Sequence, residues 1–166
     1  MKKVFIGSDH VGFEFKAKLI TYLTELGYEV HDKGAFEYDK ADDYPDFILP
    51  VARAVAENPD EYVGIVMGGS GQGEAMVASS VKGVRAALFY TPALPKKAVD
   101  AAGRQSEDPY EMIRLTREHN NSNVLSLGMR FVSEDEAKKA VKMWLESPFT
   151  GIERHARRIE KFKNVT

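Results

Sequence analysis

A glycine-rich segment near the middle of this chain constrains its fold more than any other feature. The segment, Gly68-Gly69-Ser70-Gly71-Gln72-Gly73-Glu74, follows the apolar run 62–67, which is typical of a buried β-strand, and leads into a helical pattern from 75. In such a turn the backbone N–H groups converge on an anion, and the helix N-terminus adds partial positive charge. We therefore expect an α/β fold with an anion-binding turn at the end of this strand.

Apolar strands and amphipathic helices alternate along the rest of the chain. Further strands are predicted at 4–8, 28–32, 84–89 and 124–127, and helices at 13–26, 45–58, 75–81, 133–144 and 152–162. Gly27 is the expected C-cap of the first helix, and Ser133–Glu136 is a capping box. This alternation predicts a single α/β domain, 1–166, whose five-stranded parallel sheet is covered by helices on both faces.

The stretch from Thr91 to Pro109 does not fit this alternation. It holds several prolines and Gly103 around a short helix expected at 96–102. It is long for a connection between a strand and a helix, where roughly two to six residues are typical. We interpret 91–109 as an insertion, either a functional lid or a tolerated surface loop.

The composition excludes several classes of function. The chain has 166 residues, 43% of them hydrophobic and 29% charged, which is ordinary for a globular protein. A net charge of −2 predicts no general attraction to nucleic acid or to an anionic membrane. There is no cysteine, and hence no disulfide, thiolate nucleophile or thiolate metal site. The apolar run after Met1 is too short for a signal peptide, so we expect a cytoplasmic protein.

Polar side chains adjoin three of the predicted strands. Asp9 and His10 end the first, Glu74 follows the third, and the fifth has His119-Asn120 just before it and Arg130 just after it. Open parallel sheets bind ligands at the carboxyl ends of their strands. We therefore expect these groups to converge on one site.

The glycine segment matches neither common nucleotide-binding motif. A dinucleotide fingerprint needs glycine where this chain has Glu74, and a P-loop needs Gly-Lys-Ser/Thr. A carboxylate there would also repel a pyrophosphate, so we predict a base beside an oxyanion site. A simple tight turn with a first-turn carboxylate remains the alternative. Because the helix dipole lowers the pKa of Glu74, a useful base requires burial to offset it.

The other candidates also have structural interpretations. Asp9 fits a helix cap, His10 a partly buried structural histidine, and His119 a solvated helix end. Arg154 and Arg158 lie four residues apart on one helix face, which is usually a solvated basic face but would clamp a phosphate beside an anion site. His31 and His155 have no such neighbours and are assigned no role, and Asp42-Asp43-Tyr44 fits a polar loop.

Five motifs in order make the chain similar to a known family. It resembles the type B ribose-5-phosphate isomerases, which also include galactose-6-phosphate isomerase subunits, over nearly its whole length. The motifs are Gly7–Gly12, Asp43-Tyr44-Pro45, Gly69–Gly73, Arg117–Asn121 together with Arg130, and Arg154–Arg158. Many members have a cysteine base just before the glycine run. This chain has Gly68 there and resembles the branch that has glutamate at the position of Glu74.

The resemblance implies a Rossmann-like three-layer α/β/α sandwich and a homodimer or tetramer whose active sites combine residues of two subunits. It also implies aldose–ketose isomerisation of a phosphorylated sugar without metal or other cofactor. Glu74 would be the base and His119 would open the sugar ring. Asn120 and the amides of Gly69, Ser70, Gly71 and Gly73 would hold the enediolate. The remaining implied contacts are Arg130, Arg154 and Arg158 with the phosphate, and Asp9, His10 and Tyr44 with the rest of the substrate.

Ribose 5-phosphate is the expected substrate. A hexose or tetrose phosphate is the alternative, because the insertion leads directly into the segment with His119 and could reshape the sugar pocket. A more distant alternative is a nucleotide-sensing α/β domain without catalysis. A phospho-acceptor domain would need aspartate at Gly68.

Overall fold

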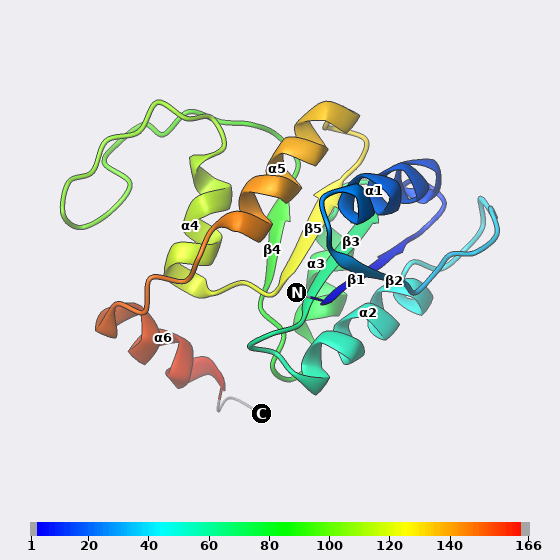
Figure 1. Cartoon of the computed structure of the whole chain (residues 1–166), viewed down its shortest axis with the longest axis horizontal. Helices are drawn as coiled ribbons and strands as arrows, with labels where there is room; N and C mark the ends of the chain where they lie inside the picture. Colours follow the sequence, from blue (N-terminus) through cyan, green and yellow to red (C-terminus); the bar gives the residue numbers. More distant parts are fainter. Residues whose placement is uncertain (1–2, 164–166) are drawn as a thin grey trace.

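The protein, represented by a computed structural model, is described over residues 3–163, and these form one parallel sheet between two layers of helices (Figure 1). The five strands lie in the order β2-β1-β3-β5-β4. They are β1 (Lys3–Ser8), β2 (Glu29–Asp32), β3 (Val63–Gly68), β4 (Ala86–Phe89) and β5 (Val124–Gly128). The helices are α1 (Phe13–Glu25), α2 (Pro45–Glu57), α3 (Gln72–Ser79), α4 (Glu111–Asn120), α5 (Glu134–Glu146) and α6 (Glu153–Lys163).

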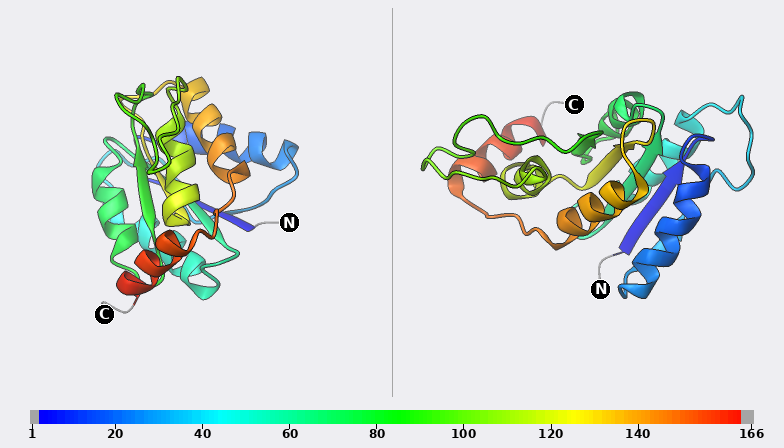
Figure 2. Two further views of the ribbon diagram at one scale, coloured as in Figure 1. Left: turned by 90° about the vertical axis from the view of Figure 1, so that its left-hand side faces the viewer. Right: turned by 90° about the horizontal axis from the view of Figure 1, so that it is seen from above.

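Helices α1, α4 and α5 cover one face of the sheet, and α2 and α3 cover the other (Figure 2). The central strand β3 is buried at every position, because both of its faces meet helices. The three-layer parallel architecture predicted from the sequence is therefore confirmed. Within residues 3–163, every helix is too short or too polar to cross a bilayer.

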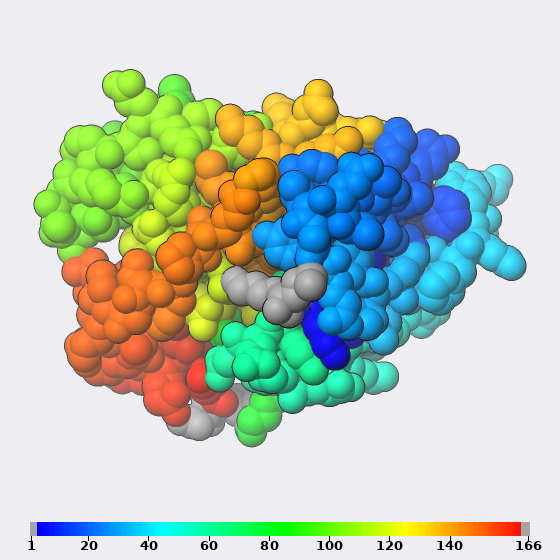
Figure 3. All heavy atoms as spheres, viewed as in Figure 1, coloured from blue at the N-terminus to red at the C-terminus, as the bar shows by residue number. Residues whose placement is uncertain are grey.

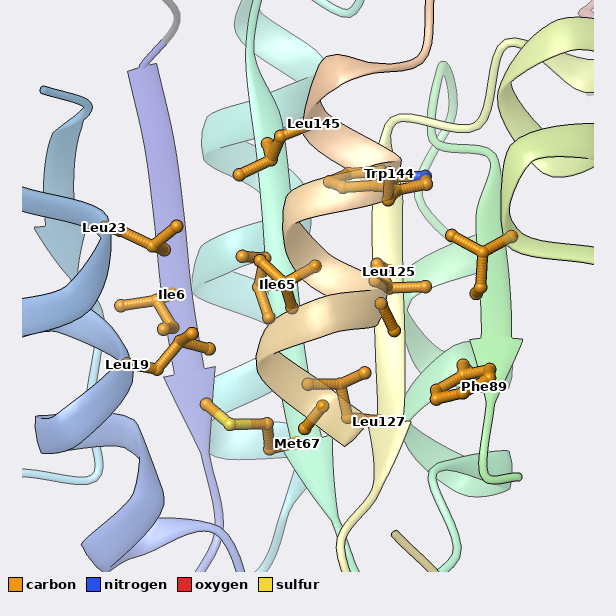
Figure 4. Close-up of a cluster of buried hydrophobic side chains, with 14 of the residues drawn as sticks. Ile6, Leu19, Leu23, Ile65, Met67, Phe89, Leu125, Leu127, Trp144 and Leu145 are labelled. Carbon is orange, nitrogen blue, oxygen red and sulfur yellow. The ribbon is translucent and has the colours of Figure 1, made fainter. Parts of the chain in front are cut away.

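The larger core lies under α1, α4 and α5. Leu19 and Leu23 of α1 pack with Ile6, while Trp144 of α5 lies over β5 (Figure 4). Trp144 is fully buried, and its indole Nε1 donates a 2.8 Å hydrogen bond to Oγ of Ser122. This bond satisfies the polar atom that burial of a tryptophan would otherwise leave unpaired.

The stretch 91–109 differs from its prediction. No regular helix forms at 96–102, since the Asp100 carboxylate accepts hydrogen bonds from the amides of Ala102 and Arg104 and stabilises a turn instead. Arg104 also forms ion pairs with Glu111 and Glu118 of α4. These contacts fasten the stretch 91–109 to α4, on the same side of the molecule as α6 (Figure 3).

Helix α4 itself was not assigned from the sequence. Its buried positions are Glu111, Ile113 and Arg117, so charged residues conceal the apolar spacing that marks a core helix. Glu111 is fully buried and pairs with Arg104 and Arg114, and Arg117 donates to backbone carbonyls. The charges are tolerated because each has partners.

Candidate active site

The candidate site lies where the strand order reverses, at the carboxyl ends of β1 and β3. From β1 the sheet continues to β2 on one side and to β3 on the other, which is the usual location for ligands in open α/β sheets. Asp9 and His10 follow β1, the glycine segment follows β3, and Arg130 follows β5. The structure thus places these predicted residues at one edge.

The Glu74 side chain occupies the space that a side chain at position 68 would fill. A Cβ on Gly68 would lie 1.8 Å from Oε1 of Glu74 and 2.3 Å from its Cδ. Glu74 is in the first turn of α3 and only 4% exposed. The absence of a side chain at Gly68 is therefore what lets the carboxylate lie against the end of β3.

Burial outweighs the helix dipole at this carboxylate. The pKa of Glu74 is raised because burial disfavours its charged form, and the charge of Asp9 adds to this, while the backbone N–H groups of Glu74 and Gly71 oppose it. The pKa of Asp9 is also raised by burial, against the N–H groups of Val11 and Gly12. Asp9 is not a helix cap: its Oδ1 accepts from the Val11 amide, and Gly12 is the N-cap.

The glycine turn requires glycine for two separate reasons. Gly71 has a φ of 74°, in the left-handed region that favours glycine, and Oγ of Ser126 donates a 2.6 Å hydrogen bond to its carbonyl. A Cβ on Gly73 would lie 2.8 Å from Oη of Tyr44. Tyr44, the N-cap residue of α2, therefore packs directly on the turn and joins the predicted site.

Two basic side chains lie at this edge of the sheet, and one of them lies over the turn. The Arg130 guanidinium lies over Gly69, since a Cβ there would be 3.4 Å from its Cζ, and the Arg130 amide donates to the Gly69 carbonyl. Nδ1 of His10 is 2.6 Å from Oδ1 of Asp42. The pKa of His10 is raised, first by this hydrogen bond, while burial and the nearby charge of Arg130 oppose the rise. The charge of Arg130 therefore acts on His10, and both residues follow strands that end at this edge of the sheet.

A second cluster forms at the C-terminus of α4. The rings of His119 and His155 have centroids 4.2 Å apart, and His155 is 3% exposed. Nδ1 of His155 donates to the His119 carbonyl at 3.2 Å, and its Nε2 accepts from Nε of Arg154 at 2.8 Å. The pKa of His119 is lowered, first by burial and then by the basic groups around it, so its ring stays neutral at physiological pH.

The expected convergence of His119 and Asn120 with Glu74 is wrong within one chain. Both precede β5, whose first residue, Val124, pairs with Gly64, while its last, Gly128, pairs with Gly68. At about 3.3 Å per residue the two edges are roughly 13 Å apart. Because the strands are parallel, residues before a strand lie at the opposite edge from residues after one. Arg154 and Arg158 are on α6, which packs on α4, and Arg154 contacts His155 beside His119.

Sequence reasoning missed two side chains of these clusters. Asp42 was placed in a polar loop, and His155 was given no neighbours. Only long-range packing brings Asp42 to His10, 32 positions away, and His155 to His119, 36 positions away.

Among the described residues, Asp9, His10 and Asp42 also have the spacing of metal ligands. The Val11 amide donates to Oδ1 of Asp9, and Nδ1 of His10 pairs with Oδ1 of Asp42, so both of these contacts form without an ion.

Comparison with known proteins decides the family. A model of the family described as Ribose/Galactose Isomerase matches residues 4–106 and 97–162. The chain belongs to the ribose/galactose isomerase family. Ribose-5-phosphate isomerase B of Mycolicibacterium paratuberculosis is 37% identical over 158 residues, covering 95% of this chain and 87% of that one. The family resemblance expected from the sequence is confirmed.

Solved structures of family members share the fold. Ribose-5-phosphate isomerase B of Mycoplasma genitalium, solved with bound ribulose-5-phosphate, matches with a TM-score of 0.85 at 37% identity, covering 98% of this chain and 95% of that one. The enzyme of Clostridium thermocellum matches with a TM-score of 0.81 at 38% identity, covering 98% and 96%.

Proposed function

We propose that this protein interconverts ribose 5-phosphate and ribulose 5-phosphate through an enediolate, with Glu74 as the base. The observation that carries the proposal is the buried Glu74 carboxylate at the end of β3, held against Gly68 beside the loop amides. Its raised pKa makes the carboxylate a stronger base than an exposed glutamate. The ribulose-5-phosphate bound to the Mycoplasma relative supports a pentose phosphate as the substrate.

The reaction moves one proton between neighbouring carbons. Glu74 takes the proton from C2 of the open-chain aldose, the C2 electron pair forms the C1=C2 double bond, and the aldehyde oxygen becomes an oxyanion. The hydroxyl proton of O2 passes to O1, and Glu74 returns its proton to C1. The loop amides of Gly69–Gly73 stabilise the oxyanion, an effect typically worth about 10²–10³-fold per donor.

The site is completed by a second copy of the chain. Glu74 lies at one edge of the sheet, and the residues on α4 and α6 lie at the opposite edge: His119, Asn120, Arg154 and Arg158. Glu74 and these residues of the same chain therefore cannot contact one small sugar together. We propose a homo-oligomer in which His119 and Asn120 of the partner subunit open the sugar ring and hold the enediolate. The arginines of the partner's α6 and Arg130 of this chain then bind the phosphate, since guanidinium groups bind phosphate with forked hydrogen bonds.

Mixing two inactive variants tests the base and the shared site together. Glu74→Gln is expected to lower kcat by about 10²–10⁴-fold with little change in KM, because it removes a base and leaves the binding groups. His119→Ala should be inactive on the cyclic sugar for a different reason, because it removes the group that opens the ring. Unfolding and refolding the two variants together should restore about a quarter of wild-type activity in a dimer, since each mixed pair has one intact site.

Each result has a clear contrary outcome. If Glu74→Gln keeps most of its kcat, Glu74 is not the base. If the mixed variants stay inactive, each site takes both residues from one chain. A panel of pentose, hexose and tetrose phosphates tests the substrate, and a preference for a six-carbon or four-carbon sugar would favour the alternative isomerase.

A further inference from the structure

The inference concerns Asp42, a buried carboxylate that the proposed reaction does not use. Asp42 lies in the loop between β2 and α2, and its side chain is 6% exposed. Its Oδ1 is 2.6 Å from Nδ1 of His10. Its Oδ2 is buried and has no hydrogen-bond partner among residues 3–163. Burying a carboxylate oxygen without a hydrogen-bond partner is costly, so the contact with His10 requires a reason.

The contact determines what His10 can offer to a ligand. Because a carboxylate only accepts, Nδ1 of His10 is the donor, and Nε2 is the nitrogen left for another group. The side chain of His10 is three-quarters buried, and its ring makes a T-shaped contact with Tyr38 of the loop that holds Asp42, with centroids 6.4 Å apart. The ring is thereby held between Asp42 and Tyr38, with Nε2 facing away from Asp42.

The charged groups around His10 favour an anion. Asp9 and Asp42 stabilise its imidazolium form, and Arg130, which lies over Gly69, is the positive group opposing it. Two cations at the same end of a parallel sheet are both stabilised when one anion binds to them. We propose that Asp42 is a positioning residue that keeps His10 oriented and protonated, so that His10 and Arg130 bind the substrate phosphate together. This proposal rests on the proposed function.

The pairing of Asp42 with His10 matters because the phosphate and the histidine ring titrate in neighbouring pH ranges. A phosphate monoester becomes a dianion above about pH 6, whereas an ordinary histidine loses its charge near pH 6.5. An unassisted histidine would therefore be mostly neutral where the phosphate carries both charges. The pKa of His10, raised by Asp42, extends the pH range in which dianion and imidazolium coexist.

The test follows the histidine ring by proton NMR while inorganic phosphate is added at pH 6 and pH 8. The chain has four histidines, and His10→Asn assigns the His10 signal. In Asp42→Asn, which keeps the side-chain shape, the His10 titration should move down toward the ordinary histidine range. Phosphate affinity should fall about ten-fold at pH 8 and less than about three-fold at pH 6. Asp42→Ala is the second variant, with the same expectation. The KM for ribose 5-phosphate should rise in the same pattern, more than kcat falls.

The matched control is Asp39→Asn. Asp39 is an exposed carboxylate of the same loop and accepts from the Ala41 amide, so its loss removes a charge and a loop hydrogen bond without touching His10. It should leave the pH pattern unchanged. In a His10→Asn background, Asp42→Asn should cause no further loss of phosphate affinity, because the two residues act as a unit.

Several results would overturn the inference. These are an equal loss at both pH values, additive losses in the double variant, an effect of Asp39→Asn as large as that of Asp42→Asn, or phosphate affinity that EDTA abolishes and Zn²⁺ restores. The last would make Asp42 a metal ligand. The NMR readout does not depend on turnover, so a protein that shows the pattern but does not isomerise ribose 5-phosphate would refute only the proposed function.

Discussion

Replacing Gly68 by alanine should inactivate the enzyme by displacing Glu74. The new Cβ would lie 1.8 Å from Oε1, whereas ordinary contacts begin at 3.4 Å. The carboxylate must therefore move by about 1.6 Å, and a misplacement of about 1 Å can cost roughly 10²-fold in rate. We expect kcat to fall by about 10²-fold or more, close to the value for Glu74→Gln, with KM changed little.

The fold should tolerate this substitution better than the chemistry does. The atoms that a Cβ at Gly68 would meet belong to the end of a side chain that can rotate, so the melting temperature should change only slightly. Gly64→Ala is the matched control on the same strand. There the Cβ would lie 2.7 Å from Cγ1 of Val51 in the core, so stability should fall while kcat is kept.

Steady-state kinetics and thermal unfolding of Gly68→Ala and Gly64→Ala measure the loss of kcat and the loss of stability separately. In Gly68→Ala combined with Glu74→Ala, the alanine at 68 should cause no further loss of kcat, because the carboxylate that it displaces is gone. A Gly68→Ala enzyme with more than half of the wild-type kcat would refute the assignment of Glu74 as a base held by the space at Gly68.

Three further predictions follow from the same geometry. Glu74→Gln should raise the melting temperature at pH 7.5 but not at pH 4, because the raised folded-state pKa of Glu74 makes wild-type stability fall as pH rises above the ordinary glutamate range. A gain of about 1 kcal/mol in the free energy of unfolding corresponds to roughly 2–4 °C, and equal shifts at both pH values would contradict this prediction. Gly73→Ala should raise KM, because the new Cβ would push Oη of Tyr44 away. Gly27→Ala is the control: its Cβ would meet nothing within 4 Å but its φ is +86°, so it should destabilise the fold without affecting KM. His119→Ala should reduce kcat/KM for the cyclic sugar more than for an open-chain analogue, and equal losses on both substrates would argue against ring opening. In the wild-type enzyme, the acid limb of the pH profile for the cyclic sugar should lie below the ordinary histidine range, because the pKa of His119 is lowered.

Much of the fold could be predicted because its signals are local. The apolar runs of the strands, the helical spacing of Leu19 and Leu23, and the capping box at Ser133 each lie within one element, and the structure has all of them. Helix α4 was missed for the opposite reason. Its buried face includes Glu111 and Arg117, whose charges are acceptable only because distant residues pair with them.

The candidate site divides in the same way. Asp9, His10, Glu74 and Arg130 could be placed at one edge because each follows a strand of a parallel sheet, and this holds for any strand order. His119 was misplaced because its position before β5 was not distinguished from a position after it. The contact between Asp42 and His10 has no local signal, since a loop position in the sequence does not reveal which side chain it meets.

By itself, the sequence determined the parallel α/β architecture, the glycine turn and a carboxylate at its end, because periodicity and turn chemistry act between residues near one another in the chain. Only the tertiary structure decided that Glu74 fills the space left by Gly68, that Asp42 holds His10, and that the His119 cluster lies at the far edge of the sheet. Those outcomes depend on strand register and side-chain packing between segments far apart in the chain.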